Sequence, residues 1–127
     1  GGTPSRNTKE TRPGGVNQGS VKPMNHITVE IWLWLGKELE GDFESPTEMR
    51  SIKEECVKEE ATIGQLLDHL AKRYPPIARH VFDMQVKKLS PNVVVIYNDQ
   101  VISPHIVHEQ VLKDGDKVKV LPIYSGG

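Results

Sequence analysis

The stretch TIGQLLDHLAKRYPP, residues 62–76, predicts one amphipathic helix around which the rest of the chain must be arranged. Thr62 and Gln65 have the spacing of a capping box, in which each side chain accepts a hydrogen bond from the other residue's backbone N–H. Apolar side chains recur at helical spacing at Ile63, Leu66, Leu67, Leu70, Ala71 and Tyr74. Pro75-Pro76 should end the helix. The helix therefore has one apolar face that needs a partner surface.

The segment before this helix predicts two strands. Over residues 27–35 every second residue is aliphatic, and this alternation is typical of a strand with one apolar face. Trp32 and Trp34 fall on the opposite face of the same predicted strand. A polar, acidic loop over 36–48 follows, and then a second strand over 50–58, whose irregular alternation allows a β-bulge.

The segment after the helix predicts three more strands, at residues 93–97, 100–102 and 117–121. The first of these is a β-branched run typical of a buried strand, and Asn98-Asp99 is a hairpin-turn signal. Residues 77–89 have an ambiguous pattern, in which we expect a short helical turn over 78–82. The order of elements predicts an α+β roll, a mixed sheet of four to five strands with one main helix packed on one face. We expect the last strand to be central and parallel to the first.

Composition limits the classes of function. The chain has 127 residues and a formal net charge of -1, so no overall positive field is available to hold nucleic acid. A single cysteine, Cys56, excludes an internal disulfide and a four-cysteine metal site. No apolar run approaches the roughly 20 residues that cross a bilayer. We therefore expect a cytoplasmic domain that is monomeric when free and has no nucleic-acid or membrane partner.

The sequence divides into three parts. Residues 1–24 are rich in Gly, Pro, Ser, Thr and basic side chains, and we expect them to be a disordered tail. Residues 25–122 carry the predicted folded domain. Residues 123–127 follow Pro122, which should end the last strand, and form a short C-terminal tail that we expect to be flexible.

Three pieces of the sequence resemble the ubiquitin-like β-grasp sulfur carriers of the MoaD/ThiS family. They are the segment LGKEL at 35–39, the helix from Ala61-Thr62-Ile63 to Tyr74-Pro75, and the C-terminal segment LKDGDKVKVLPIYSGG at 112–127. Their order and spacing carry the resemblance, which implies a ubiquitin-like β-grasp fold. Residues 36–58 and 77–91 depart from the family pattern, and this leaves the biosynthetic pathway open.

The resemblance also implies a role for the C-terminal glycine. In this family an E1-like adenylating enzyme uses ATP to activate the terminal carboxylate, here that of Gly127, and a sulfurtransferase or sulfide donor converts it to a thiocarboxylate. Gly126 and Gly127 lack the side chains that would block entry into a narrow nucleotide site, and Tyr124 and Ser125 complete the tail. The chain itself would hold no cofactor and would be a co-substrate, not an enzyme.

The acceptor implied first is a synthase subunit of molybdopterin biosynthesis, because residues 35–39 and Leu121-Pro122 look most like that branch. Thiamine or cysteine biosynthesis stays open. Two other classes of function also stay open. One is a ubiquitin-like modifier conjugated to other proteins through the same terminus, and the other is a non-covalent β-grasp binding module.

Four apolar residues are candidates for contact with these partners: Trp32, Trp34, Leu121 and Ile123. Exposed aromatic residues often anchor interfaces. The alternative is that the loop over 36–50 folds over the two tryptophans. Cys56 is expected to be a partly buried strand residue. The five scattered histidines predict no metal site, and no catalytic constellation stands out.

Overall fold

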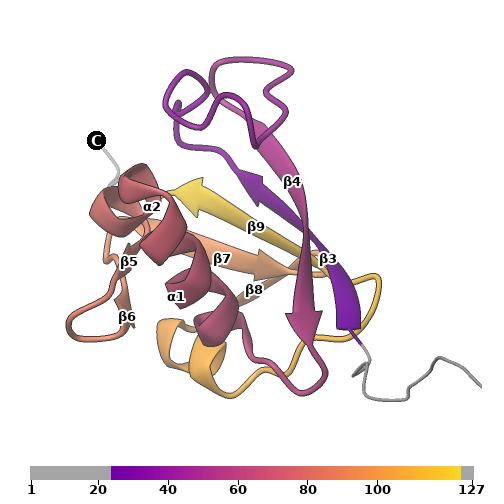
Figure 1. Cartoon of the computed structure of the whole chain (residues 1–127). Helices are drawn as coiled ribbons and strands as arrows, with labels where there is room; N and C mark the ends of the chain where they lie inside the picture. Colours follow the sequence, from indigo (N-terminus) through magenta and orange to yellow (C-terminus); the bar gives the residue numbers. More distant parts are fainter. Residues whose placement is uncertain (1–23, 124–127) are drawn as a thin grey trace, which may run out of the picture.

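The computed structural model describes residues 24–123. Within them, a five-stranded mixed sheet in the order β4-β3-β9-β7-β8 forms the centre of the domain (Figure 1). Its strands are β3 (Met24–Ile31), β4 (Ser51–Lys58), β7 (Val93–Tyr97), β8 (Gln100–Ile102) and β9 (Lys117–Pro122). The last strand, β9, is central and parallel to β3, and its other neighbour, β7, is antiparallel. The predicted α+β roll is confirmed.

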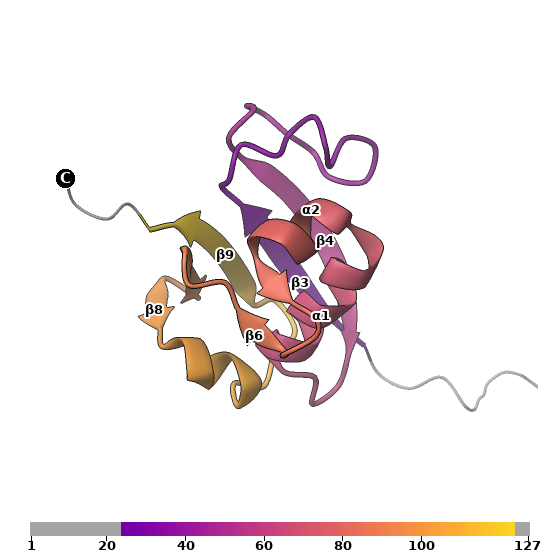
Figure 2. The ribbon, with the colours of Figure 1, turned by 90° about the vertical axis from the view of Figure 1, so that its left-hand side faces the viewer.

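Helix α1 (Ile63–Arg73) packs across one face of this sheet (Figures 1 and 2). The capping box is present: the backbone N–H of Gln65 donates to Thr62 Oγ1 at 3.2 Å, and that of Thr62 to Gln65 Oε1 at 3.0 Å. All six predicted apolar residues of the helix pattern are buried in the core. From the sheet, the fully buried residues include Ile27, Val29, Ile31, Val95, Val118 and Val120. One apolar helix face and one apolar sheet face therefore bury each other.

The segment after α1 is more ordered than the sequence predicts. Helix α2 (Pro75–His80) begins at the first proline, because proline fits the first turn of a helix, where its missing N–H needs no partner. The helical turn expected over 78–82 is therefore placed too late. Phe82 already belongs to β5 (Phe82–Asp83), which pairs with β6 (Lys88–Leu89) in a small hairpin.

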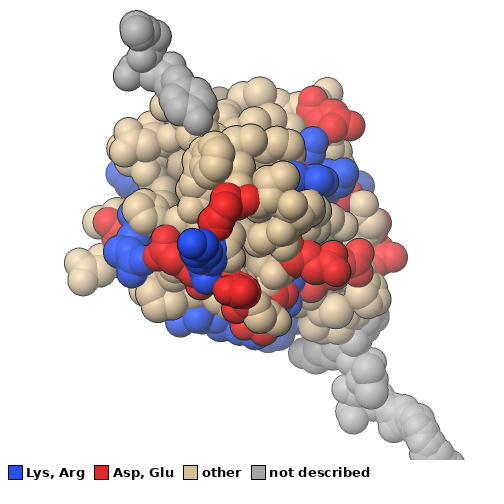
Figure 3. All heavy atoms as spheres, turned by 90° about the horizontal axis from the view of Figure 1, so that it is seen from above, with Lys and Arg blue, Asp and Glu red and all other residues tan. Residues whose placement is uncertain are grey.

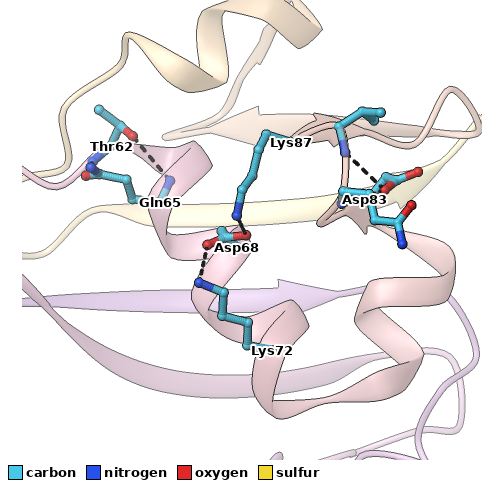
Figure 4. A network of polar contacts seen from close by, with 8 residues as sticks. Thr62, Gln65, Asp68, Lys72, Asp83 and Lys87 are labelled. Carbon is cyan, nitrogen blue, oxygen red and sulfur yellow. Dashed lines mark hydrogen bonds and ion pairs between the residues drawn. The ribbon is translucent and has the colours of Figure 1, made fainter.

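A carboxylate on α1 ties this hairpin to the helix. Asp68 pairs with Lys72 one turn along at 3.0 Å, and it accepts a hydrogen bond at 2.8 Å from Lys87 in the hairpin turn (Figure 4). The two lysine partners outweigh the opposing effect of burial, and the bond from Lys87 is the largest influence that holds the pKa of Asp68 below its usual value.

Strand β3 ends earlier than its alternation predicts. The ladder with β4 stops at Ile31, and Trp34 lies in a loop with a backbone φ of +59°. Leu35 is nevertheless buried, because the loop folds back so that Leu35, Leu39 and Phe43 join the core, and Leu33 is partly buried against it. The alternation of aliphatic residues over 27–35 therefore reflects a strand up to Ile31 and a packed loop beyond it.

The pairing of β4 with β3 runs without interruption from Met24↔Lys58 to Ile31↔Ser51, so no bulge is present between them. Cys56 is exposed, not partly buried, because it lies on the side of β4 opposite buried Val57. Most acidic residues between Glu38 and Glu60 are exposed, but Glu55 in β4 is buried and pairs with Lys53 at 2.9 Å.

Candidate functional site

Strand β9 carries the chain from the middle of the sheet toward its C-terminus. Figure 2 shows that this strand ends at the rim of the domain. Beyond the strand, the backbone N–H of Ile123 donates to the carbonyl of Asn92 at 2.8 Å, so the chain stays attached to the sheet up to this residue. The predicted reactive tail Tyr124, Ser125, Gly126 and Gly127 lies outside the described residues, as do residues 1–23 of the tail predicted over residues 1–24; Met24 is the first residue of β3.

The start of β9 is fixed by one buried carboxylate. Asp116 accepts hydrogen bonds from the Tyr97 hydroxyl, from Asn98 Nδ2 at 3.0 Å and from the backbone N–H of Lys113 at 2.7 Å. Burial alone would raise the pKa of Asp116, but these donors hold it below its usual value. Burial and the bond to this carboxylate raise the pKa of Tyr97 to about 12. Asn98 and Asp99 both have positive φ, as the predicted hairpin turn requires.

The sheet face turned away from α1, here called the outer face, carries an apolar strip. Val94 pairs with Leu121, and Ile96 pairs with Val101, so these four residues share one side of three neighbouring strands. Val101 is 69 % exposed, and the other three are half-buried. The apolar strip, Val94, Ile96, Val101 and Leu121, therefore leaves apolar surface open beside the strand that leads to the C-terminus.

The structure places three of the four predicted contact residues around the end of β9, and the fourth, Trp34, in the loop after β3. Leu121 belongs to the apolar strip, and Ile123 is 51 % exposed just beyond it. Trp32 follows the last residue of β3, and its backbone N–H donates to Val120 O at 2.9 Å. Trp34 is 63 % exposed, so the loop over 36–50 does not cover it. Trp32, in contrast, is half-buried and contacts Arg50 at the end of this loop.

Sequence reasoning missed two residues of this site, Glu30 and Arg50. Glu30 lies on the outer face, yet its side chain is only 3 % exposed. Arg50 Nε and Trp32 Nε1 both donate to Glu30 Oε1 at 3.0 Å, and Lys117 Nζ lies 3.5 Å from Oε2. Burial alone would raise the pKa of Glu30, but these partners hold it below its usual value. The available signal was one acidic residue, Glu30, between two core aliphatics of a strand.

The described residues form a surface that a partner could contact, and they do not form a metal site. Over residues 24–123, no group of three His, Cys, Asp or Glu side chains could hold a metal ion. In the same part of the chain, no helix is long and apolar enough to cross a membrane. Seen from above, acidic and basic side chains are interspersed around a broad uncharged area (Figure 3). This face of the domain therefore carries no dominant field of one sign.

Comparison with solved structures shows the same fold in archaeal and bacterial proteins. The Haloferax volcanii HVO 2177 protein is 21 % identical, with a TM-score of 0.63, over 91 % of this chain and 100 % of that one. SAMP1 from the same organism is 19 % identical, with a TM-score of 0.58, over 81 % and 100 %. A chain of the Amycolatopsis orientalis BexX/CysO complex is 23 % identical, with a TM-score of 0.50, over 80 % and 99 %.

These likenesses confirm the predicted β-grasp fold. No sequence among the curated proteins matches this chain. The sequence pattern of the ThiS family does match, over residues 44–127, which include most of the sheet, both helices and the C-terminal glycines. The members of that family are sulfur carriers and not catalysts. By this match, the chain belongs to the ThiS family.

Proposed function

We propose that this chain carries sulfur as a thiocarboxylate on Gly127. An E1-like enzyme would bind ATP, and the Gly127 carboxylate would attack the α-phosphate, which releases pyrophosphate and leaves an acyl-adenylate. Sulfide would then attack the carbonyl carbon and displace AMP, which leaves the thiocarboxylate. The match to the ThiS family, which extends through Gly126-Gly127, is the observation that carries this proposal. No side chain of this domain needs to act as acid, base or nucleophile.

The fold supports this proposal by the way in which it presents the terminus. Strand β9 is paired with β3 as far as Val120 and with β7 as far as Pro122. From Ile123, the last residue bonded to the sheet, to Gly127 the chain can extend about 14 Å, enough to enter the active site of another protein. The domain then serves as a handle, while the partner supplies the chemistry.

We propose that the adenylating enzyme docks on the outer face around Trp32, Trp34, Leu121 and Ile123. Apolar and aromatic side chains near the strand that leads to the C-terminus provide contact area for a partner that must reach Gly127. The thiocarboxylate would pass its sulfur to a synthase subunit. Molybdopterin biosynthesis is the first candidate for this step, with thiamine or cysteine biosynthesis as alternatives.

A second candidate function is protein modification through the same terminus. The observation that favours it is the structural likeness to SAMP1, described for Methanosarcina acetivorans as a small archaeal modifier protein. The adenylated glycine would then be attacked by a lysine amine of another protein, which releases AMP and forms an isopeptide bond. Both functions need Gly126-Gly127, so the fate of the activated carbonyl separates them.

The test is the intact mass of the full chain after incubation with ATP, sulfide and the adenylating enzyme of the same organism. We expect the mass increase of one oxygen-for-sulfur exchange, confined to the peptide that ends in Gly127. A chain without Gly126-Gly127 should show no increase while its fold is intact. Covalent attachment of the chain to other proteins, without the sulfur exchange, would favour the modifier. An unchanged mass with an enzyme that is active on a known carrier would contradict both.

A further inference from the structure

One carboxylate, that of Glu30, lies buried on the side of the sheet that faces away from the core. Its neighbours on the outer face, Thr28 in β3 and Lys119 across in β9, are partly exposed. Glu30 is covered by three side chains that converge on it: Trp32 from beyond the end of β3, Arg50 from the end of the loop, and Lys117 from β9. The cluster of these four residues joins three separate segments of the chain.

Stability alone does not explain this cluster. Removing a carboxylate from water costs free energy, and a buried ion pair is often no better for stability than well-packed apolar residues of similar volume. A β-branched residue would suit this strand position equally well. The carboxylate instead orients its neighbours, because a charged acceptor holds the side chains that donate to it in fixed positions.

The distances show which groups are fixed. One oxygen, Glu30 Oε1, accepts from both Trp32 Nε1 and Arg50 Nε at 3.0 Å, so the indole and the guanidinium are drawn to the same point. The Arg50 guanidinium carbon lies 5.4 Å from the Trp32 ring centroid, within the range of a cation–π contact. Trp32 is thereby held from its ring edge and from its ring face.

We infer that Glu30 is a positioning residue that holds Trp32 and Arg50 as a preformed anchor for the adenylating enzyme, an inference that depends on the proposed function. The anchor lies next to the end of β9, because Trp32 N donates to Val120 O one residue before Leu121. An aromatic side chain fixed in advance loses less conformational freedom on binding, and this raises affinity without a new contact. Glu30 would raise affinity without touching the partner.

The first test needs no partner. In the full chain, Glu30→Gln should change the NMR shift of the Trp32 indole N–H and speed its exchange with water, because the charged acceptor and the stacked Arg50 are lost. The indole of Trp34, which makes no such contact with Glu30, serves as an internal reference. The control is Glu54, an exposed glutamate on the outer face of β4: Glu54→Gln should leave both indole signals unchanged.

The second test is a double-mutant cycle on binding to the adenylating enzyme of the same organism. Glu30→Gln should weaken binding about tenfold in the wild-type background and less than about twofold in Trp32→Phe, because coupled residues are not additive. Arg50→Lys keeps a charge at the loop end but loses the stacked guanidinium, so it should also weaken binding. This surface variant keeps the test valid should Glu30→Gln fold poorly.

The outcomes separate this inference from the proposed function. An unchanged NMR signal of the Trp32 indole N–H in Glu30→Gln would overturn the positioning role alone. So would a loss of affinity by the same factor in the wild-type and Trp32→Phe backgrounds. A wild-type chain that is neither bound nor adenylated would overturn the proposed function and, with it, the docking part of this inference. Weaker binding of Glu54→Gln, by as much as Glu30→Gln, would show that only the net charge of the face matters.

Discussion

The two faces of the sheet are built by the same strands, yet they are organised by different interactions. On the inner face, against α1, Ile27, Val29, Ile31, Val118 and Val120 are fully buried aliphatics that pack without polar partners. On the outer face, the intervening residues alternate between charge and apolar surface, as at Glu30, Lys119 and Leu121. Along β3 and β9, the inner face is therefore determined by the volume of the buried side chains, and the outer face by hydrogen bonds and ion pairs that orient them. Substitutions on the two faces should affect different measurable quantities.

The largest expected effect is on stability and comes from the inner face. Ile31→Ala removes a fully buried side chain and should lower the free energy of unfolding by about 3 kcal/mol. Leu121→Ala, on the half-buried outer face, should cost about 1 kcal/mol or less but weaken binding to the adenylating enzyme. Urea unfolding and a binding titration of both variants test the contrast. Equal stability losses, with binding unaffected by Leu121→Ala, would contradict the division between the faces.

The next effect concerns the hydrogen bond from Tyr97 to Asp116, which fixes the start of β9 and so affects both faces of the sheet. The pKa of Tyr97 is raised from 10.0 to about 12, so the folded state favours the neutral phenol next to Asp116. Its contribution to stability is complete below pH 10 and is lost as the pH rises toward 12. Wild-type stability should therefore fall more than that of Tyr97→Phe in this window.

Unfolding in urea just below pH 10 and near pH 12 measures this difference. Every other titratable group is the same in both proteins, so the difference between the two isolates Tyr97. If the free energy of unfolding falls equally with pH in the two proteins, the bond from Tyr97 to Asp116 does not contribute to the pH dependence of stability.

The inner face was predictable from the sequence, and most of the outer face was not. Period-two alternation over 27–31, the capping box at Thr62 and the turn at Asn98-Asp99 are local signals, and local structure follows them. The end of β3 was not predictable, because Leu35 is buried by a loop that folds back on itself. The Glu30 cluster was not predictable either, since it depends on Arg50, twenty residues away in the sequence. Contacts between distant segments leave no pattern in either segment alone.

Trp34 provides the smallest expected effect on stability and the sharpest comparison. Its φ of +59° lies in the left-handed region, which disfavours an L side chain by about 1 kcal/mol, and its side chain is 63 % exposed. Neither the backbone nor the solvent-exposed indole gains stability from a tryptophan here. A strained, exposed aromatic residue is better explained by recognition than by folding.

Two variants separate these contributions. Trp34→Ala removes the indole but keeps a Cβ in the left-handed conformation, whereas Trp34→Gly removes both. The glycine variant should be more stable than the alanine variant by up to about 1 kcal/mol, because only glycine adopts this φ without strain. Both should weaken binding to the adenylating enzyme equally, by about tenfold. Wild-type affinity in both variants would show that Trp34 is not part of the docking face. Retained affinity in Trp34→Gly alone would show that backbone conformation, and not the indole, is what the partner needs at this position.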